Sequence, residues 1–286
     1  MSAEILCPVE ALAAVEAVCG EDTVLKLISR RRGSSVWQCS GRLRAVALKV
    51  GVGPDGAEIT ARETKVLIEM GAGHSLLGRG RGFGSGQAAA WMLTPWYDGP
   101  STWEIFREVR ASTGRWEAAR AHASDLCKAV AQLHAAGWVH ADLQPQHAIH
   151  TGEGVRLIDC SWAWHPTMLL PSGLFRGGRP HFLAPELARS IHEGVRPVAP
   201  LQPAEVYALA ASLWTAITGT WPLDYARIGV DPDNLTPAVL RQIIGTQRIP
   251  LRGPQVWPDV QDVLREVLTK PAERRLTAAE LARKLL

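Results

Sequence analysis

The sequence has few of the features that mark secreted, membrane-spanning or disulfide-rich proteins. Only five of its 286 residues are cysteines, an odd number, and they lie far apart and never form a C-x-x-C pair, which argues against a disulfide framework and against a zinc site. No apolar run approaches the roughly eighteen residues of a membrane span. The first residues are acidic where a signal peptide would be basic. We therefore expect a protein of the reducing cytoplasm that does not associate with a membrane.

Net charge is also low. The chain carries 31 basic and 28 acidic residues, a formal charge of +3, and its arginines are scattered, with the densest cluster at residues 30–32. A charge this small gives no reason to expect a nucleic-acid partner. Apolar residues make up 47% of the chain, which is enough for a substantial folded core. The sequence gives no indication of oligomeric state.

Local patterns divide the chain into two parts. The first third reads as a short helix followed by strand-like segments, whereas from residue 101 onward apolar residues recur at helical spacing. The expected elements of the first part are a helix at 8–18, strands at 25–28, 35–39 and 44–50, a second helix, and one or two short strands in the glycine-rich tract 71–87. The likeliest junction is 95–100. These patterns predict an α+β protein with a small strand-rich lobe, residues 1–97, and a larger helical lobe, residues 98–286.

The segment "AVALKV", residues 45–50, is the first with chemical interest. A strand period of two places Ala45, Ala47 and Lys49 on one face and three larger apolar residues on the other. A face of small side chains that ends in a lysine leaves room for a flat ligand and supplies one cation. By itself this pattern also fits an exposed lysine on an edge strand.

The helix that follows contains a carboxylate within its apolar stripe. The stripe consists of Ile59, Val66, Leu67 and Met70. Glu63 lies on the same face by helical spacing, and a buried carboxylate needs a partner because an isolated buried charge costs several kcal/mol. Lys49 is the nearest candidate, so we predict a Lys49–Glu63 ion pair. Glu58 and Glu69 lie off the stripe and are expected to be solvated.

A predicted hairpin brings the other charged residues together. The stretch "WVHADLQPQHAIH", residues 138–150, is followed by a glycine-flanked turn and by "VRLIDC", which predicts strands near 148–150 and 155–158. Because antiparallel strands bring their outer ends together, His147 should lie near Asp159, and Asp142 is on the loop that enters the hairpin. Two carboxylates and a lysine suit phosphoryl transfer, where cations neutralise phosphate charge and a carboxylate orients the attacking hydroxyl.

Three histidines in one short stretch could also indicate a metal cluster. The hairpin separates them, so that His140 is expected to brace the loop, His150 to be an ordinary strand residue, and His147 to lie at the metal edge. Taken singly, an aspartate after a strand is often only a turn former and a lone histidine is usually a packed residue. The joint spacing favours the catalytic interpretation.

Several motifs, in the right order from about residue 25 to 286, resemble the eukaryotic-type protein kinase superfamily. "VALK" is similar to the V-A-I-K motif, "WMLTPWYDG" to the hinge, "HADLQPQH" to the catalytic loop H-R-D-L-K-P-x-N, and "LIDCS" to the D-F-G segment. "GGRPHFLAPELA" resembles the end of an activation segment, "EVYALAASLWTAITGTWP" the following helix, and "KPAERRLTAAEL" the closing segment. The resemblance implies a bilobal fold, with one main helix beside an antiparallel sheet in the first lobe, and implies that Arg274 or Arg275 pairs with Glu186.

The same resemblance implies how ATP would be bound. Lys49 would hold the α and β phosphates and Glu63 would orient it. Ala47 would lie against the adenine face, Thr94 would occupy the gatekeeper place, and the backbone around Trp96 would meet the adenine edge.

The resemblance also implies catalytic roles in the second lobe. Asp142 would accept or steer the proton of the substrate hydroxyl, and Asp159 would bind Mg²⁺. Gln144 stands where a lysine contacts the transferred phosphate, which removes a charge from the transition state. His147 stands where an asparagine binds a second Mg²⁺, and imidazole is a poorer ligand than oxygen for that ion. For His147, a metal-contacting role and a structural role remain equally open.

The glycine loop is the poorest match. When Val36 is aligned with the valine of G-x-G-x-x-G-x-V, serines and an arginine replace the glycines: Ser29, Arg31 and Ser34. Gly33 falls one place early. A loop that cradles phosphate favours glycine because the backbone must approach the anion closely. Gly33 and Ser34 are nevertheless the candidates for phosphate contact, and Arg30, Arg31 or Arg32 could supply charge instead.

Three functions are consistent with these features. The leading one is ATP-dependent phosphorylation of a hydroxyl, of the serine or threonine type, in a protein or peptide, because "GGRPHFLAPELA" resembles the platform that holds peptide substrates. A pseudokinase that binds nucleotide or holds a partner is the main alternative, which the altered glycine loop, Gln144 and His147 favour. A small-molecule kinase is the third.

Overall fold

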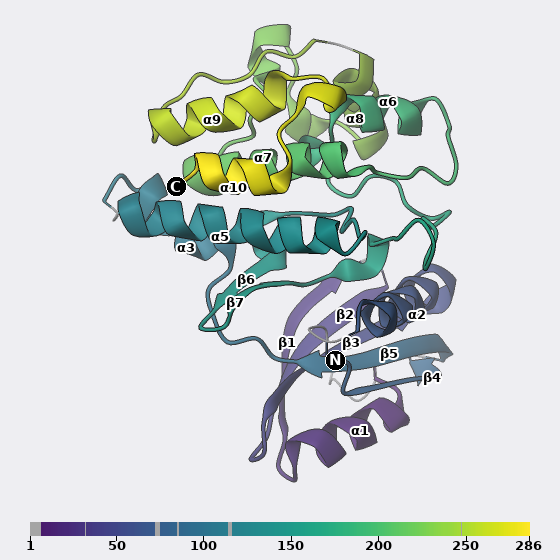
Figure 1. Ribbon diagram of the computed structural model, residues 1–286. Coiled ribbons are helices and arrows are strands. Elements are labelled where there is room, and N and C mark those ends of the chain that lie inside the picture. The colour runs from purple at the N-terminus through teal and green to yellow at the C-terminus, as the bar shows by residue number, and fades with distance from the viewer. Residues whose placement is uncertain (1–6, 32, 72–74, 85, 114–115, 247) are drawn as a thin grey trace. The chain divides into compact units, whose positions relative to one another are not determined.

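The structure, a computed structural model of residues 1–286, describes the whole chain except residues 1–6, 32, 72–74, 85, 114–115 and 247. The chain divides into two compact units, residues 1–97 and 98–286 (Figure 1). The first is built on an antiparallel sheet and the second is mainly helical. The fold class is α+β, as predicted.

A five-stranded antiparallel sheet forms the first unit, with the strand order β1-β2-β3-β5-β4. Its strands are β1 (Val24–Arg31), β2 (Ser34–Ser40), β3 (Ala45–Val52), β4 (Gly78–Gly84) and β5 (Gln87–Pro95). Its two helices are α1 (Val9–Cys19) and α2 (Gly53–Met70). β1 is three residues longer at its carboxyl end than predicted, and the glycine-rich tract contributes one strand, β4.

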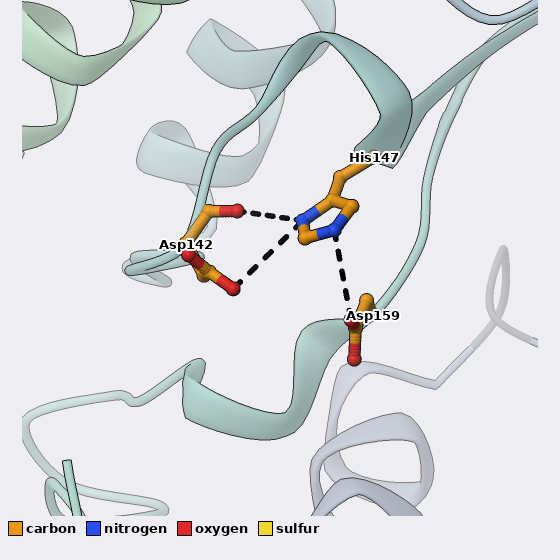
Figure 2. Close-up of side chains that lie close together, drawn as sticks. All are labelled: Asp142, His147 and Asp159. Carbon is orange, nitrogen blue, oxygen red and sulfur yellow. Dashed lines mark hydrogen bonds and ion pairs between the residues drawn. The ribbon is translucent and has the colours of Figure 1, made fainter. Parts of the chain in front are cut away.

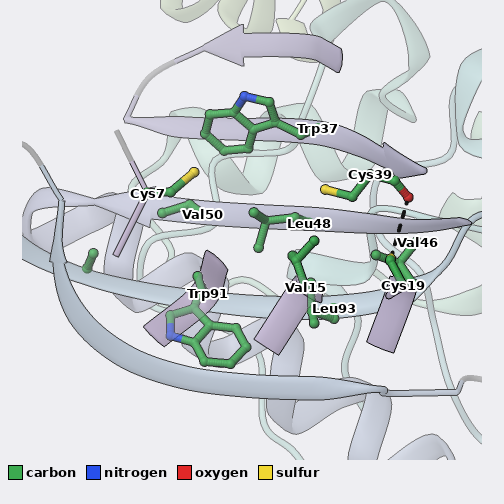
Figure 3. Packing of buried hydrophobic residues seen from close by; sticks show 12 residues of the cluster. Cys7, Val15, Cys19, Trp37, Cys39, Val46, Leu48, Val50, Trp91 and Leu93 are labelled. Atoms are coloured by element: carbon green, nitrogen blue, oxygen red, sulfur yellow. Dashed lines mark hydrogen bonds between the residues drawn. The ribbon is translucent and has the colours of Figure 1, made fainter. Parts of the chain in front are cut away.

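The central strand β3 has the predicted two faces. Val46, Leu48 and Val50 are fully buried, whereas Ala47 and Lys49 are half-buried. The buried face packs against α1 and against large side chains of β2 and β5, including Trp37 (Figure 3). The amino-terminal helix therefore covers one face of the sheet with an apolar core and leaves the opposite face of β3, the one with the lysine, to α2.

The cysteines take part in packing. All five are free and buried, and Cys7, Cys19 and Cys39 belong to the core between α1 and the sheet (Figure 3). Burial raises the pKa of the Cys7 thiol to about 11 and that of Cys39 to about 12. These thiols stay protonated near neutral pH and act as small apolar groups.

The second unit surrounds one buried helix, α7 (Gln202–Thr218). Its other helices of eight or more residues are α5 (Trp116–Ala135), α6 (Pro185–His192), α8 (Pro237–Thr246) and α9 (Pro258–Thr269). Shorter helices are α3 (Thr102–Ile105), α4 (Arg107–Arg110) and α10 (Ala278–Lys284). Helix α7 ends at a left-handed Gly219, whose N–H donates to the Thr215 carbonyl. None of the described helices is long and apolar enough to cross a membrane.

A buried arginine ties the carboxyl-terminal segment to α6. Arg275 forms two hydrogen bonds with the Glu186 carboxylate, one of them Nη2 to Oε2 at 2.8 Å. The guanidinium also lies 5.1 Å from the centre of the Tyr207 ring on α7. The sequence left open whether Arg274 or Arg275 pairs with Glu186, and in the structure it is Arg275.

Candidate active site

Lys49 and Glu63 form the predicted ion pair in the first unit. Lys49 Nζ lies 2.5 Å from Glu63 Oε2, and the side chains are only 13% and 4% exposed. Strand β3 supplies the lysine and α2 the glutamate, so the pair joins the helix to the sheet. Glu58 and Glu69 are exposed, as expected. A partly desolvated ammonium held in one place by a carboxylate is suited to binding an anion.

The small-residue face of β3 continues onto its neighbour. Ala47 pairs with Thr94 of β5 and with Gln38 of β2 in the antiparallel register. Paired residues lie side by side on one face of a sheet, so Ala47, Thr94 and Lys49 line the same surface. Trp96, which follows β5, donates its N–H to the Ala45 carbonyl at 3.2 Å, so this N–H is already engaged within the first unit.

The segment at the position of a glycine loop is a tight hairpin. Strand β1 ends at Arg31 and β2 begins at Ser34, which pairs with it. Gly33 has φ of +77° and accepts a hydrogen bond from Val52 N–H at 2.7 Å, so the turn is attached to the start of α2. Arg30 and Arg31 are exposed, and Arg32 lies outside the described residues.

In the second unit, the predicted hairpin is formed by β6 (Ala148–Thr151) and β7 (Gly154–Leu157). The ladder continues one step beyond the strands, because Ile158 N–H donates to the His147 carbonyl at 2.9 Å. This contact places His147 Nε2 3.6 Å from Asp159 Oδ2 (Figure 2). The proximity of these two residues, inferred from hairpin geometry, is confirmed.

His147 also contacts Asp142, on the other side of its ring. Nδ1 lies 2.8 Å from the Asp142 carbonyl oxygen and 3.9 Å from the Asp142 carboxylate oxygen Oδ2 (Figure 2). A carbonyl oxygen can only accept, so Nδ1 carries the proton. In the neutral ring the lone pair is then on Nε2, which points toward Asp159.

The Asp142 carboxylate is largely buried but well supplied with donors. Gln144 Nε2 donates to Oδ1 at 3.0 Å, and the backbone of Arg179 forms a further hydrogen bond with the carboxylate. Burial is the main reason that the pKa of Asp142 is raised to about 6; the interaction with His147 opposes the rise, the Asp159 carboxylate adds to it, and the hydrogen bonds from Gln144 and Arg179 oppose it. A carboxyl with a pKa in this range can both accept and release a proton near neutral pH.

Glu205 on α7 and His140 hold the loop that carries Asp142 in place. Glu205 accepts a hydrogen bond from the Ala141 N–H at 2.6 Å and contacts His134 Nε2 at 2.8 Å. His140 is fully buried and its Nε2 lies 3.0 Å from the Ile158 carbonyl oxygen, as the predicted brace. Ala141 has φ of +70°, a conformation that needs such support in a residue with a Cβ.

His150 has the structural place expected for it. It lies in β6, is buried, and its Nε2 is 2.9 Å from Thr102 Oγ1 of α3. Burial lowers its pKa to about 4, so the ring is neutral near pH 7. Of the three histidines in residues 138–150, only His147 belongs to the candidate site.

Two parts of the site were not found from the sequence. His134, in the last turn of α5, supports Glu205, and Gly178 packs against Asp142. Neither residue carries a local signal, because each acts on a residue that is distant in sequence or hidden in a loop. The "GG" at 177–178 suggested only the end of an activation segment.

We expect Gly178→Ala to disturb the site. Gly178 has φ of +58°, and a Cβ there would lie 2.1 Å from Asp142 Oδ1. The carboxylate would have to move, and a shift of about 1 Å in a reacting group can cost about 10²-fold in rate. Gly194→Ala is a matched control, since Gly194 also has positive φ, +86°, but its Cβ would meet nothing within 4 Å. Both variants should lose stability from backbone strain, and only Gly178→Ala should lose turnover. Equal turnover in the two variants would contradict the inclusion of Asp142 and Gly178 in the site.

The donor set fits a divalent cation. Asp142, His147 and Asp159 each offer one ligand atom, and these atoms lie within 4.8 Å of one another. Asp159 has a left-handed backbone, φ 60°, its side chain is 41% exposed, and Ser161 Oγ donates to its Oδ1 at 3.1 Å. Carboxylate oxygens are the ligands that Mg²⁺ prefers, whereas the imidazole nitrogen suits transition metals.

Comparisons with known proteins agree with the geometry. No family model matches the chain. The sequence is 30% identical over 182 residues to serine/threonine-protein kinase PkaB of Streptomyces coelicolor, which is 59% of this chain and 39% of PkaB. The fold is protein-kinase-like. Serine/threonine-protein kinase AfsK of Streptomyces griseus is 28% identical over 171 residues, 53% of this chain and 20% of AfsK. The chain therefore matches less than half the length of either relative, and is similar in sequence to part of two bacterial serine/threonine protein kinases.

Proposed function

We propose that the protein transfers the γ-phosphoryl group of ATP to a serine or threonine hydroxyl of a protein or peptide. The observation that carries the proposal is the Asp142 carboxylate, which is buried, hydrogen-bonded and close to a set of cation ligands. The similarity of the chain to two serine/threonine protein kinases supports the same chemistry. Five free cysteines support a reducing compartment, the cytoplasm.

Each unit has its own part in this function. In the first unit Lys49, oriented by Glu63, binds phosphate oxygens, and Ala47 and Thr94 line the surface for adenine. Gly33 and Ser34 form the turn that we assign to the phosphates. A divalent cation, Mg²⁺ in the simplest case, neutralises phosphate charge when it is bound.

The second unit supplies the ligands and the base. Asp159 and His147 hold the cation, and Asp142 accepts the proton of the attacking hydroxyl. Gln144 donates its amide to Asp142 and thereby orients the carboxylate. Because it is uncharged, Gln144 stabilises transferred phosphate less than a lysine would.

The segment that precedes and begins α6 favours a peptide over a small molecule, because "GGRPHFLAPELA" resembles the platform that holds peptide substrates. Its apolar side chains Phe182, Leu183 and Leu187 lie beside Asp142. Small-molecule phosphorylation is the alternative within the same chemistry.

The pseudokinase is the alternative from another class. It is favoured by the altered glycine loop, by the uncharged Gln144 and by His147, and opposed by the intact Lys49, Glu63, Asp142 and Asp159. Under this alternative the second unit would hold a partner protein and Asp142 would have no reaction to assist.

One experiment separates these functions. The chain is incubated with γ-labelled ATP and divalent cation against a library of peptides with a single serine, threonine or tyrosine, while ATP binding is followed by thermal shift. We expect stabilisation by ATP and label on serine or threonine peptides. Stabilisation with no transfer to any peptide or to a panel of small hydroxyl compounds supports a nucleotide-binding pseudokinase. Absence of ATP binding contradicts the proposed phosphate transfer and supports a pseudokinase that only holds a partner.

A further inference from the structure

The imidazole of His147 is oriented as a metal ligand. Its Nδ1–H donates to the Asp142 carbonyl at 2.8 Å, so the neutral ring presents the Nε2 lone pair to the side of Asp159. Histidines that bind metals almost always donate their other N–H to a carbonyl or carboxylate, which sets the tautomer and the direction of the ring. That arrangement is present here before any ion is considered (Figure 2).

The spacing of the donor atoms also suits a single ion. Two donors that each lie about 2.1 Å from a metal are separated by about 3.0 Å at right angles and about 3.4 Å at the tetrahedral angle. His147 Nε2 and Asp159 Oδ2 are 3.6 Å apart, so a small adjustment of the half-exposed Asp159 side chain is sufficient. The Asp142 carboxylate, within 4.8 Å, adds negative charge beside the ion.

The orientation of the ring is held by buried parts of the second unit. The carbonyl that receives Nδ1–H belongs to the loop that Glu205 and His140 brace. The His147 backbone is fixed by the hydrogen bond from Ile158 N–H. The imidazole therefore needs little rotation when an ion binds. A nitrogen ligand that is already in place favours an ion that binds well to nitrogen.

We propose that this site binds its divalent cation through His147 Nε2 and Asp159, and that the imidazole makes it selective for Mn²⁺ and Co²⁺ over Mg²⁺. Affinity for nitrogen ligands rises along the first-row transition metals, whereas Mg²⁺ favours oxygen and releases its water reluctantly. The inference rests on the proposed function only in that the ion accompanies ATP. An asparagine at 147 would offer an oxygen ligand and would remove the selectivity.

The test uses metals alone and then metals with a non-hydrolysable ATP analogue. Binding of Mn²⁺ is titrated by the electron paramagnetic resonance signal of the free ion, and Mg²⁺ by competition, at one fixed pH for all variants. We expect His147→Asn to lower the ratio of Mn²⁺ to Mg²⁺ affinity by about 10-fold or more, the scale on which changes around a metal site act. His192→Asn, on an exposed histidine at the end of α6, is the matched control and should leave the ratio unchanged.

A spectroscopic measurement identifies the ligand directly. Electron spin-echo modulation of bound Mn²⁺ should show coupling to a ¹⁴N nucleus in the wild type and in His192→Asn, and should lose it in His147→Asn. Absence of the coupling in the wild type overturns the proposal even if the variant fails to fold, and so does an equal affinity ratio in wild type and His147→Asn. Coupling without phosphate transfer would defeat the proposed function alone, whereas transfer without coupling would defeat this inference alone.

Discussion

Replacing Asp142 with asparagine is expected to lower phosphate transfer by about 10²- to 10⁴-fold, the range in which a positioned general base acts. The amide keeps the shape of the carboxylate, and its oxygen can still accept a hydrogen bond from Gln144, so the loop should remain folded, but the amide cannot accept the proton of the hydroxyl. ATP binding should persist, because Lys49 and Glu63 belong to the other unit. The measurement is the initial rate of transfer from γ-labelled ATP, with thermal shift for binding.

The control for this variant is Asp125→Asn. Asp125 lies on α5, is about half exposed and pairs with Lys128, so the same change of charge is made in the same unit away from the site. Its rate should equal that of the wild type. A rate for Asp142→Asn within a few fold of the control would show that Asp142 does not act as the base.

Replacing Lys49 with methionine is expected to have the second largest effect. The change removes the ammonium that faces Glu63, whose side chain is only 4% exposed. Removing one partner of a buried ion pair costs about 3 to 5 kcal/mol in the free energy of unfolding. Binding of ATP should also be lost, because the cation that we assign to the phosphates is gone. Urea unfolding and thermal shift with ATP measure the two effects.

A double variant separates the structural from the functional part of the pair. Lys49→Met combined with Glu63→Leu removes both charges, and replacing a whole buried pair by apolar groups is often neutral or stabilising. We expect the stability to recover and ATP binding to remain absent. Lys26→Met, on an exposed lysine of β1, should change neither property. Recovery of ATP binding in the double variant would contradict the role assigned to Lys49.

The features that could be predicted were those set by local periodicity. The alternation of "AVALKV" places Lys49 opposite the buried face of β3, and helical spacing places Glu63 in an apolar stripe that needs a countercharge. Hairpin geometry brings His147 to Asp159 from the positions of two strands and a turn. The ends of elements were less certain, as the longer β1 illustrates, because sheet pairing extends a strand beyond its strongest local pattern.

Other properties depended on residues far apart in the chain. Burial raises the pKa of Asp142, which lies against Gly178, and α7 supplies the glutamate that fixes the loop. The sequence left His147 between a metal-contacting and a structural role. The ring orientation that favours the metal comes from a backbone carbonyl, which every residue carries and no sequence pattern can single out.

The sequence by itself determined the α+β class, the Lys49–Glu63 pair and the proximity of His147 to Asp159, since strands, helices and hairpins repeat at periods that a single segment reveals. Only the tertiary structure decided how Asp142 is buried, which way the His147 imidazole points and how the first helix covers the sheet. Those outcomes follow from packing between distant segments, where burial and hydrogen-bond direction set the chemistry of each group.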